Sequence, residues 1–189
     1  MTRSLWSIVL GCILVALPLL AGAQVDKIGK PDTLVAEIGK IDAMHWTITV
    51  SLTNDEYLLG LSVPLKMTAG LNRVVADSAV FIGGRIANFA IRAFRADTAI
   101  QCVLLGAVAS VGGPRARLDP GTGRLATIFV SSLDKKPIEK LAVDTTTMHP
   151  SNSLMVIADS VQGTPPDTTV ITDQKTMQIV PAFVVKFAQ

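Results

Sequence analysis

The chain has 189 residues, of which 49% are hydrophobic, 17% charged and 5% aromatic, and its formal net charge is +2. This length fits one domain of ordinary size or two small ones. The apolar content excludes an intrinsically disordered chain, and the small net charge excludes the strong basic field of a non-specific nucleic-acid binder. Two cysteines exclude a disulfide-dense scaffold.

The N-terminus has the three parts of a secretory signal peptide. One positive charge in the first four residues precedes an apolar run over 5–20, which ends in the small-residue sequence Ala21-Gly22-Ala23. We therefore expect a signal peptide over 1–23, cleaved after Ala23. The mature chain over 24–189 is then exported, to the periplasm or the exterior, without a membrane span. The competing interpretation is a membrane anchor, because the apolar run over 5–20 is only just shorter than the roughly 17 to 25 residues needed to span a bilayer.

Two neighbouring segments alternate between apolar and polar residues, which is typical of half-buried strands. The first runs from Trp46 to Thr53 and the second from Gly60 to Met67, with the turn sequence Asn54-Asp55-Glu56 after the first. A shift by one residue would expose every apolar side chain, so the pattern also fixes the register. Pro64 has no N–H for a strand ladder and predicts an edge strand or a bulge.

Further short strands are predicted along the chain, separated by turn clusters rich in glycine, proline, aspartate and asparagine. They cover Leu34–Ile38, Val74–Ile82, Asn88–Arg95, Ile100–Ala109, Leu125–Ser131, Leu141–Thr146, Leu154–Ala158 and Met177–Val185. The polar segment 159–175 predicts a long loop before the last strand. No stretch has the period and caps of a helix. The sequence therefore predicts an all-β fold, an antiparallel β-sandwich or barrel of about nine strands in a single domain.

The order of these strands and turns resembles that of a known family. The resemblance lies in Thr47–Asn54 with Leu59–Leu65, in Gln101–Val108, in Gly121–Val130 after a glycine-rich turn, and in Asp144–Thr146 with Ser153–Met155. These segments resemble the strands of a cohesin-like domain, a jelly-roll β-sandwich related to bacterial cellulose-binding modules. An immunoglobulin-like or fibronectin-like sandwich would share much of the pattern.

The resemblance implies a non-catalytic binding module that engages a protein partner or matrix component through a sheet face or its loops. Cohesins receive a calcium-loaded dockerin on one sheet face, so the implied partner is a dockerin-like or other extracellular protein. The alternative is a carbohydrate-binding module of the same fold that recognises a polysaccharide. Tyr57, at a turn, is the aromatic residue that would then serve as an exposed platform. One ring is too few for a crystalline-cellulose surface.

The residues that carry most enzyme chemistry are sparse. His45 lies at a strand entrance and His149 in a turn, and neither has a nucleophile elbow beside it. Cys102 has apolar neighbours and is expected to be a buried small hydrophobe. Two histidines and one such cysteine cannot supply a zinc site. We therefore expect neither an enzyme nor a zinc protein. Four arginines in one stretch are expected on a solvated sheet edge, with an anionic partner site as the alternative: Arg73, Arg85, Arg92 and Arg95.

Calcium is the one metal for which the sequence offers ligands. Asn54-Asp55-Glu56, Asp167 and Asp173 provide hard oxygen atoms in loops. No segment matches the D-x-[DN]-x-[DN]-G loop, so turn formation and solubility are the expected roles of these acids. The prediction is that the chain has no cofactor, with structural calcium as the alternative. Tyr57, Asp55 and Glu56 are the predicted ligand-binding residues.

Overall fold

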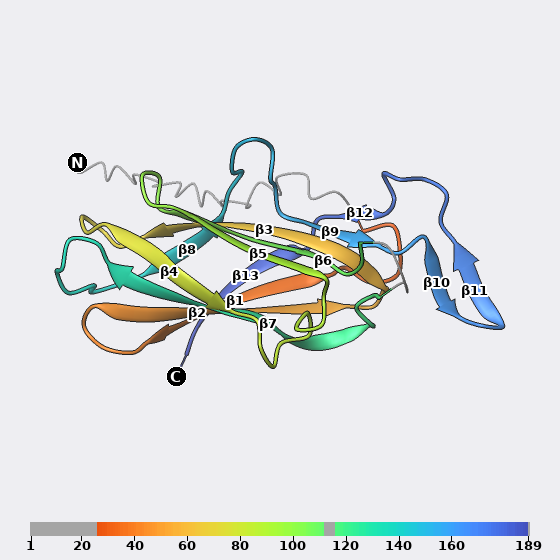
Figure 1. The fold of residues 1–189 in the computed structure, drawn as a ribbon, viewed down its shortest axis with the longest axis horizontal. Helices are drawn as coiled ribbons and strands as arrows, with labels where there is room; N and C mark the ends of the chain where they lie inside the picture. Colours follow the sequence, from red (N-terminus) through yellow and green to blue (C-terminus); the bar gives the residue numbers. More distant parts are fainter. Residues whose placement is uncertain (1–25, 112–115, 189) are drawn as a thin grey trace, which may run out of the picture.

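The computed structural model describes residues 26–111 and 116–188, whose regular elements are all strands (Figure 1). The predicted signal peptide over 1–23 lies outside these residues. Within the described ranges the chain forms no helix with the length and hydropathy to cross a membrane. The strands form two sheets that pack face to face as two layers, with a separate hairpin at one end (Figure 1).

The first sheet has the order β13-β1-β2-β7-β4. Its neighbouring strands are antiparallel, except that β1 and β13 run in parallel. The strands are β1 (Thr33–Lys40), β2 (His45–Asn54), β4 (Val74–Val80), β7 (Gly121–Ser132) and β13 (Ala182–Phe187).

The second sheet has the order β12-β9-β3-β6-β5, with β8 also paired to β3. All its pairs are antiparallel. The strands are β3 (Leu58–Thr68), β5 (Ile91–Asp97), β6 (Cys102–Val108), β8 (Ala142–Thr145), β9 (Met155–Ala158) and β12 (Gln178–Ile179). The predicted all-β sandwich is confirmed, and β5 is the edge strand expected at Arg92 and Arg95.

The core lies between the two sheets and is made by the alternating residues. In β2, Ile48, Val50 and Leu52 have no exposed surface, and Trp46 is 7% exposed. Burying each such side chain stabilises the fold by about 1.5–3 kcal/mol. In β3 the same face carries Val63, Leu65 and Met67, again with no exposed surface. The period-two pattern therefore gave the correct inner face of both strands.

Pro64 lies in the interior of the second sheet, so the edge prediction is wrong. The main register shift in β3 lies between Leu58 and Gly60, so there is no bulge at Pro64 either. The Pro64 carbonyl accepts a hydrogen bond from the Thr146 N–H, at 3.3 Å, immediately after β8. The Pro64 nitrogen faces that same side. There β9 pairs with β3 up to Ser62 and β8 pairs with it from Leu65, so no partner strand requires an N–H from Pro64. A central strand can therefore hold a proline here.

The segment 159–175 is not the predicted loop throughout. It contains the antiparallel hairpin β10 (Val161–Thr164) and β11 (Asp167–Val170), which projects from one end of the sandwich (Figure 1). Pro165-Pro166 forms the turn between its strands, so the prolines join strands instead of excluding them.

The last predicted strand, Met177–Val185, is two strands in different sheets. β12 pairs with β9, and β13 pairs with β1. Val180-Pro181 separates them, because proline cannot continue the β12 ladder. The chain crosses from one sheet to the other at this point.

Candidate functional site

The outer faces of the two sheets differ in chemistry. On the first sheet, the outward residues of β2 are Thr47, Thr49, Ser51 and Thr53, and their partners on β7 include Thr127 and Thr122. This ladder of hydroxyl groups is suited to contact with water. The outer face of the second sheet is largely apolar, and we name it the β3–β6 face.

One row of the β3–β6 face carries exposed apolar side chains. The register places Ile91 of β5, Val108 of β6, Gly60 of β3 and Ile157 of β9 side by side. Ile91, Val108 and Ile157 are 46%, 42% and 37% exposed. Three large apolar side chains in one row of a sheet form a patch, and such patches mark interaction sites.

The next row is made of small residues. Ala93, Gly106 and Ser62 are aligned across β5, β6 and β3, and Met155 of β9 completes the row. Because three of the four side chains are small, another molecule can approach the sheet backbone closely here. The β3–β6 face therefore combines apolar contact area with a shallow surface.

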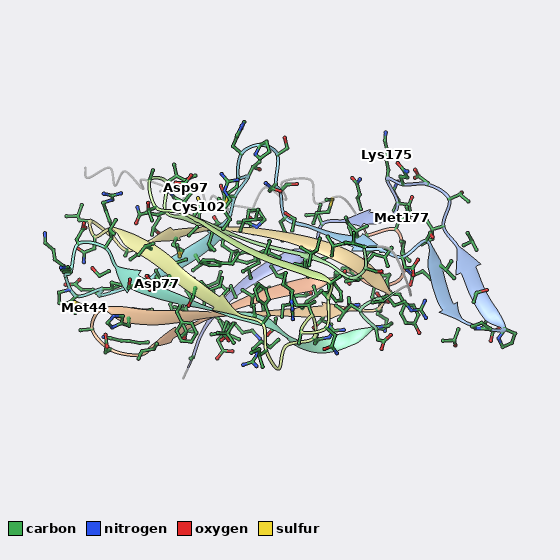
Figure 2. All side chains as sticks on the ribbon, viewed as in Figure 1. Met44, Asp77, Asp97, Cys102, Lys175 and Met177 are labelled. Carbon is green, nitrogen blue, oxygen red and sulfur yellow. The ribbon has the colours of Figure 1, made fainter. Side chains whose placement is uncertain are left out.

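The far end of the β3–β6 face is charged, with Asp97, Lys66 and Asp144 around Cys102. Asp97 and Cys102 lie next to each other on this layer (Figure 2). Cys102 is 3% exposed, and burial raises the pKa of its thiol. The thiol is thus a weak nucleophile, and the prediction of a buried small hydrophobe is confirmed.

His45 begins β2, and His149 lies in a turn after β8. His45 Nδ1 lies 2.8 Å from Asp42 Oδ2, and both residues are exposed at the β1–β2 turn. The Asp42 carboxylate also accepts a hydrogen bond from the Met44 N–H, which with His45 lowers its pKa. The His149 carbonyl accepts a hydrogen bond from Arg95 at 3.3 Å. These contacts tie turns together.

Tyr57 is half-buried, and the Arg117 guanidinium lies 3.4 Å from the centre of its ring. The Tyr57 N–H donates to Gln162 Oε1 at 2.8 Å, and its carbonyl accepts from the Asp159 N–H at 2.6 Å. The arginine covers one face of the ring. This leaves less of Tyr57 for stacking on a sugar than the sequence predicts, and gives it a role in holding the β10–β11 hairpin.

Four carboxylates converge at the end of the first two strands. One oxygen each of Asp26, Asp32, Asp55 and Glu56 lies within 4.8 Å of the others, and we name this group the acidic cluster. The predicted residues Asp55 and Glu56 belong to it. The Asn54 amide oxygen instead accepts a hydrogen bond from Arg85, and Asp167 and Asp173 are not in the cluster.

Sequence reasoning missed Asp26 and Asp32, although the topology explains them. β1 and β2 are antiparallel, and Thr33 at the start of β1 pairs with Thr53 at the end of β2. Acids placed just before β1 therefore meet acids placed just after β2. The signal that places Asp32 beside Asp55 is the pairing of these two neighbouring strands as a hairpin.

Two members of the acidic cluster are buried. Asp32 is 1% exposed and Glu56 is 2% exposed. Burial and the charge of Asp26 raise the pKa of Asp32 to about 7. Burial, the adjoining Asp55 carboxyl and the charge of Asp32 raise the pKa of Glu56 to about 9. Both groups therefore lack the stabilisation that a carboxylate needs when it is removed from water.

The backbone around the acidic cluster is fixed by Arg85 and Gly29. Arg85 Nη1 donates to Asn54 Oδ1 at 2.7 Å, and Asn54 Nδ2 donates to the Glu56 carbonyl at 2.6 Å. Gly29 has a φ of 79°, and a Cβ there would lie 2.5 Å from Asp55 Oδ2. Only glycine lets the segment before β1 approach Asp55 this closely.

Solved cohesin structures are similar to this chain in fold. A type I cohesin–dockerin complex from Clostridium thermocellum matches with a TM-score of 0.53 and 10% identity, over 84% of this chain and 100% of that chain. The CaDoc0917–CaCohA2 complex matches with a TM-score of 0.50 and 9% identity, over 83% of this chain and 99% of that chain. A non-cellulosomal cohesin from the archaeon Archaeoglobus fulgidus matches with a TM-score of 0.47 and 8% identity, over 85% of this chain and 93% of that chain.

No protein-family model matches the chain, and no curated protein matches it. The structural matches show a cohesin-like sandwich, as the sequence predicts.

Proposed function

We propose that this cohesin-like sandwich is an exported protein-binding module whose β3–β6 face receives a dockerin-like protein. The observation that carries the proposal is the row of Ile91, Val108 and Ile157 next to the row of small residues. Protein interfaces combine an apolar centre with a polar rim, and the charged end of this face supplies part of such a rim. Two of the matched structures are complexes, one of them described as cohesin–dockerin, and they support the class of partner.

The other outer face is less suited to this function. Its hydroxyl ladder on β2 and β7 keeps hydrogen bonds with water that a partner would have to replace. Ala93 and Gly106 of the β3–β6 face have no polar side-chain group, so contact over them removes apolar surface from water at about 25 cal/mol per Å². The polysaccharide alternative is less favoured, since Arg117 covers one face of the Tyr57 ring that would stack on a sugar.

The test compares an arginine placed on each outer face. Ala93 is exposed on the edge strand β5, so Ala93→Arg puts a long charged side chain over the row of small residues without entering the core. Thr49→Arg is the matched control on the hydroxyl ladder. Immobilised full chain is used to capture proteins from the culture medium of the source organism, and bound proteins are identified by mass spectrometry.

We expect wild type and Thr49→Arg to capture the same dockerin-like protein, and Ala93→Arg to lose at least about tenfold in affinity, as for an interface hot spot. Equal capture by all three proteins would place the partner on another surface. Retention on an insoluble polysaccharide, abolished by Tyr57→Ala, would favour the alternative.

A further inference from the structure

The acidic cluster contains more buried carboxyl oxygens than the described protein groups satisfy. In the described part of the chain, no hydrogen bond of ordinary geometry reaches either carboxylate oxygen of Asp32 or of Glu56. One oxygen of Asp26 is also buried without a partner, while the other accepts from the Ile28 N–H at 2.9 Å. Buried charges are normally paired or bound to a metal.

The positive groups nearby do not fill this role. Arg85 donates to the carbonyls of Leu52 and Gly121 and to Asn54, at 2.7–3.0 Å, and also to the Asp119 carbonyl. Its hydrogen-bonding capacity is directed to the backbone of the strands. Lys30 contributes its backbone N–H, which donates to Asp55 Oδ2 at 2.9 Å and fixes the one exposed acid of the cluster.

The spacing of the carboxylates allows one calcium ion to contact all four. Two ligands of one ion cannot lie farther apart than twice the metal–oxygen distance, which is about 4.6–5.2 Å for calcium. The four oxygen atoms lie within 4.8 Å of one another. All four ligands are carboxylates, the hard oxygen donors that calcium prefers, and magnesium usually retains several waters instead of accepting an all-protein set.

We propose that Asp26, Asp32, Asp55 and Glu56 bind one calcium ion that fastens the segment before β1 to the β2–β3 turn. Gly29 permits the close approach of the two segments, and the Arg85–Asn54 contacts hold the second of them. The ion supplies the positive charge that Asp32 and Glu56 lack. This site is distinct from the β3–β6 face and does not depend on the function proposed for that face.

Thermal unfolding of the purified full chain tests the proposal, with the chelator EDTA, with calcium and with magnesium. Extracellular calcium sites have Kd values of about 10⁻⁴–10⁻³ M, so titration calorimetry covers that range. At a hundredfold excess of calcium over Kd we expect the Tm to rise by about 5–10 °C relative to EDTA. Magnesium should give a clearly smaller rise.

Asp32→Asn removes one buried charge and keeps the shape of the side chain. We expect this variant to lose the calcium-dependent rise in Tm and the binding heat, and to melt in EDTA at or above the temperature of the wild type. The melt in EDTA also shows that the variant folds. Asp167→Asn, at an exposed acid outside the cluster, is the control and should keep the full response.

Three results would overturn the proposal. They are a wild-type Tm that is the same in calcium and EDTA without measurable binding, a calcium response retained by Asp32→Asn, and a response lost in Asp167→Asn. An equal rise with magnesium would overturn the choice of calcium.

Discussion

At the scale of single residues, Arg85 connects the ends of several strands. The expectation of a solvated sheet edge is wrong for this arginine. It is half-buried, and its guanidinium donates to backbone carbonyls of β2 and β7 and of the segment before β7. It crosses Gly123, where a Cβ would lie 2.9 Å from Arg85 Cδ. Gly121-Thr122-Gly123 is typical of a turn in composition, but these residues belong to β7, where the glycines leave room for this side chain.

Arg85→Lys keeps the charge but removes the planar fork that reaches several carbonyls. We expect the variant to lose about 1.5–3 kcal/mol of the free energy of unfolding, because hydrogen bonds to a charged group are replaced incompletely. The measurement is urea denaturation at constant calcium concentration. Arg92→Lys, on the exposed edge strand, should change stability by less than about 0.5 kcal/mol. Equal losses in the two variants would contradict the role given to Arg85.

At the scale of elements, the two faces of β2 have different roles. Ile48 faces the core and has no exposed surface, and its neighbour Thr49 belongs to the hydroxyl ladder on the outer face. Ile48→Ala should lower the free energy of unfolding by about 2–5 kcal/mol, because it leaves a cavity between the sheets. Thr49→Ala should cost less than about 1 kcal/mol. Chemical denaturation of both variants measures the difference, and a similar cost for each would mean that the two faces are not distinguished.

The β10–β11 hairpin is fastened differently, by polar contacts. Its residues are half-buried or exposed, and Gln162 joins it to the sandwich through Tyr57 and the Asp159 carbonyl. Elements with few buried apolar contacts open locally before the whole domain unfolds.

Gln162→Ala should therefore speed cleavage within 161–170 by a protease several-fold while shifting the Tm by less than about 2 °C. Limited proteolysis followed by mass spectrometry locates the cut. The control is Thr169→Ala, at the position paired with Gln162 on the exposed β11. Cleavage at the wild-type rate in Gln162→Ala would show that other contacts hold the hairpin.

At the scale of the whole molecule, local patterns predicted the architecture well. The alternation in β2 and β3 is a property of neighbouring residues, so the sequence alone predicted which side chains of these strands face the core. The position of Pro64 was misread because it depends on where β8 and β9, far away in the sequence, meet β3. The hairpin at 161–170 was missed because Pro165-Pro166 indicates a loop, and the strands on either side are only four residues long.

For the same reason, only two of the four residues of the acidic cluster were predicted from the sequence. Asp55 and Glu56 are adjacent to a turn signal, whereas Asp26 and Asp32 join them only through the pairing of β1 with β2. The β3–β6 face depends on the register of four strands and has no local signature. Its rows become visible only when the second sheet is assembled.

The parallel pairing of β1 with β13 has a mechanical consequence. The register runs from Thr33 opposite Ala182 to Ile38 opposite Phe187, and both strands point the same way. A force that pulls Thr33 and Phe187 apart along the strands loads this ladder in shear, so its hydrogen bonds resist together instead of opening one by one. In a protein that joins two bodies, this pair of strands would bear tension before the core is disturbed.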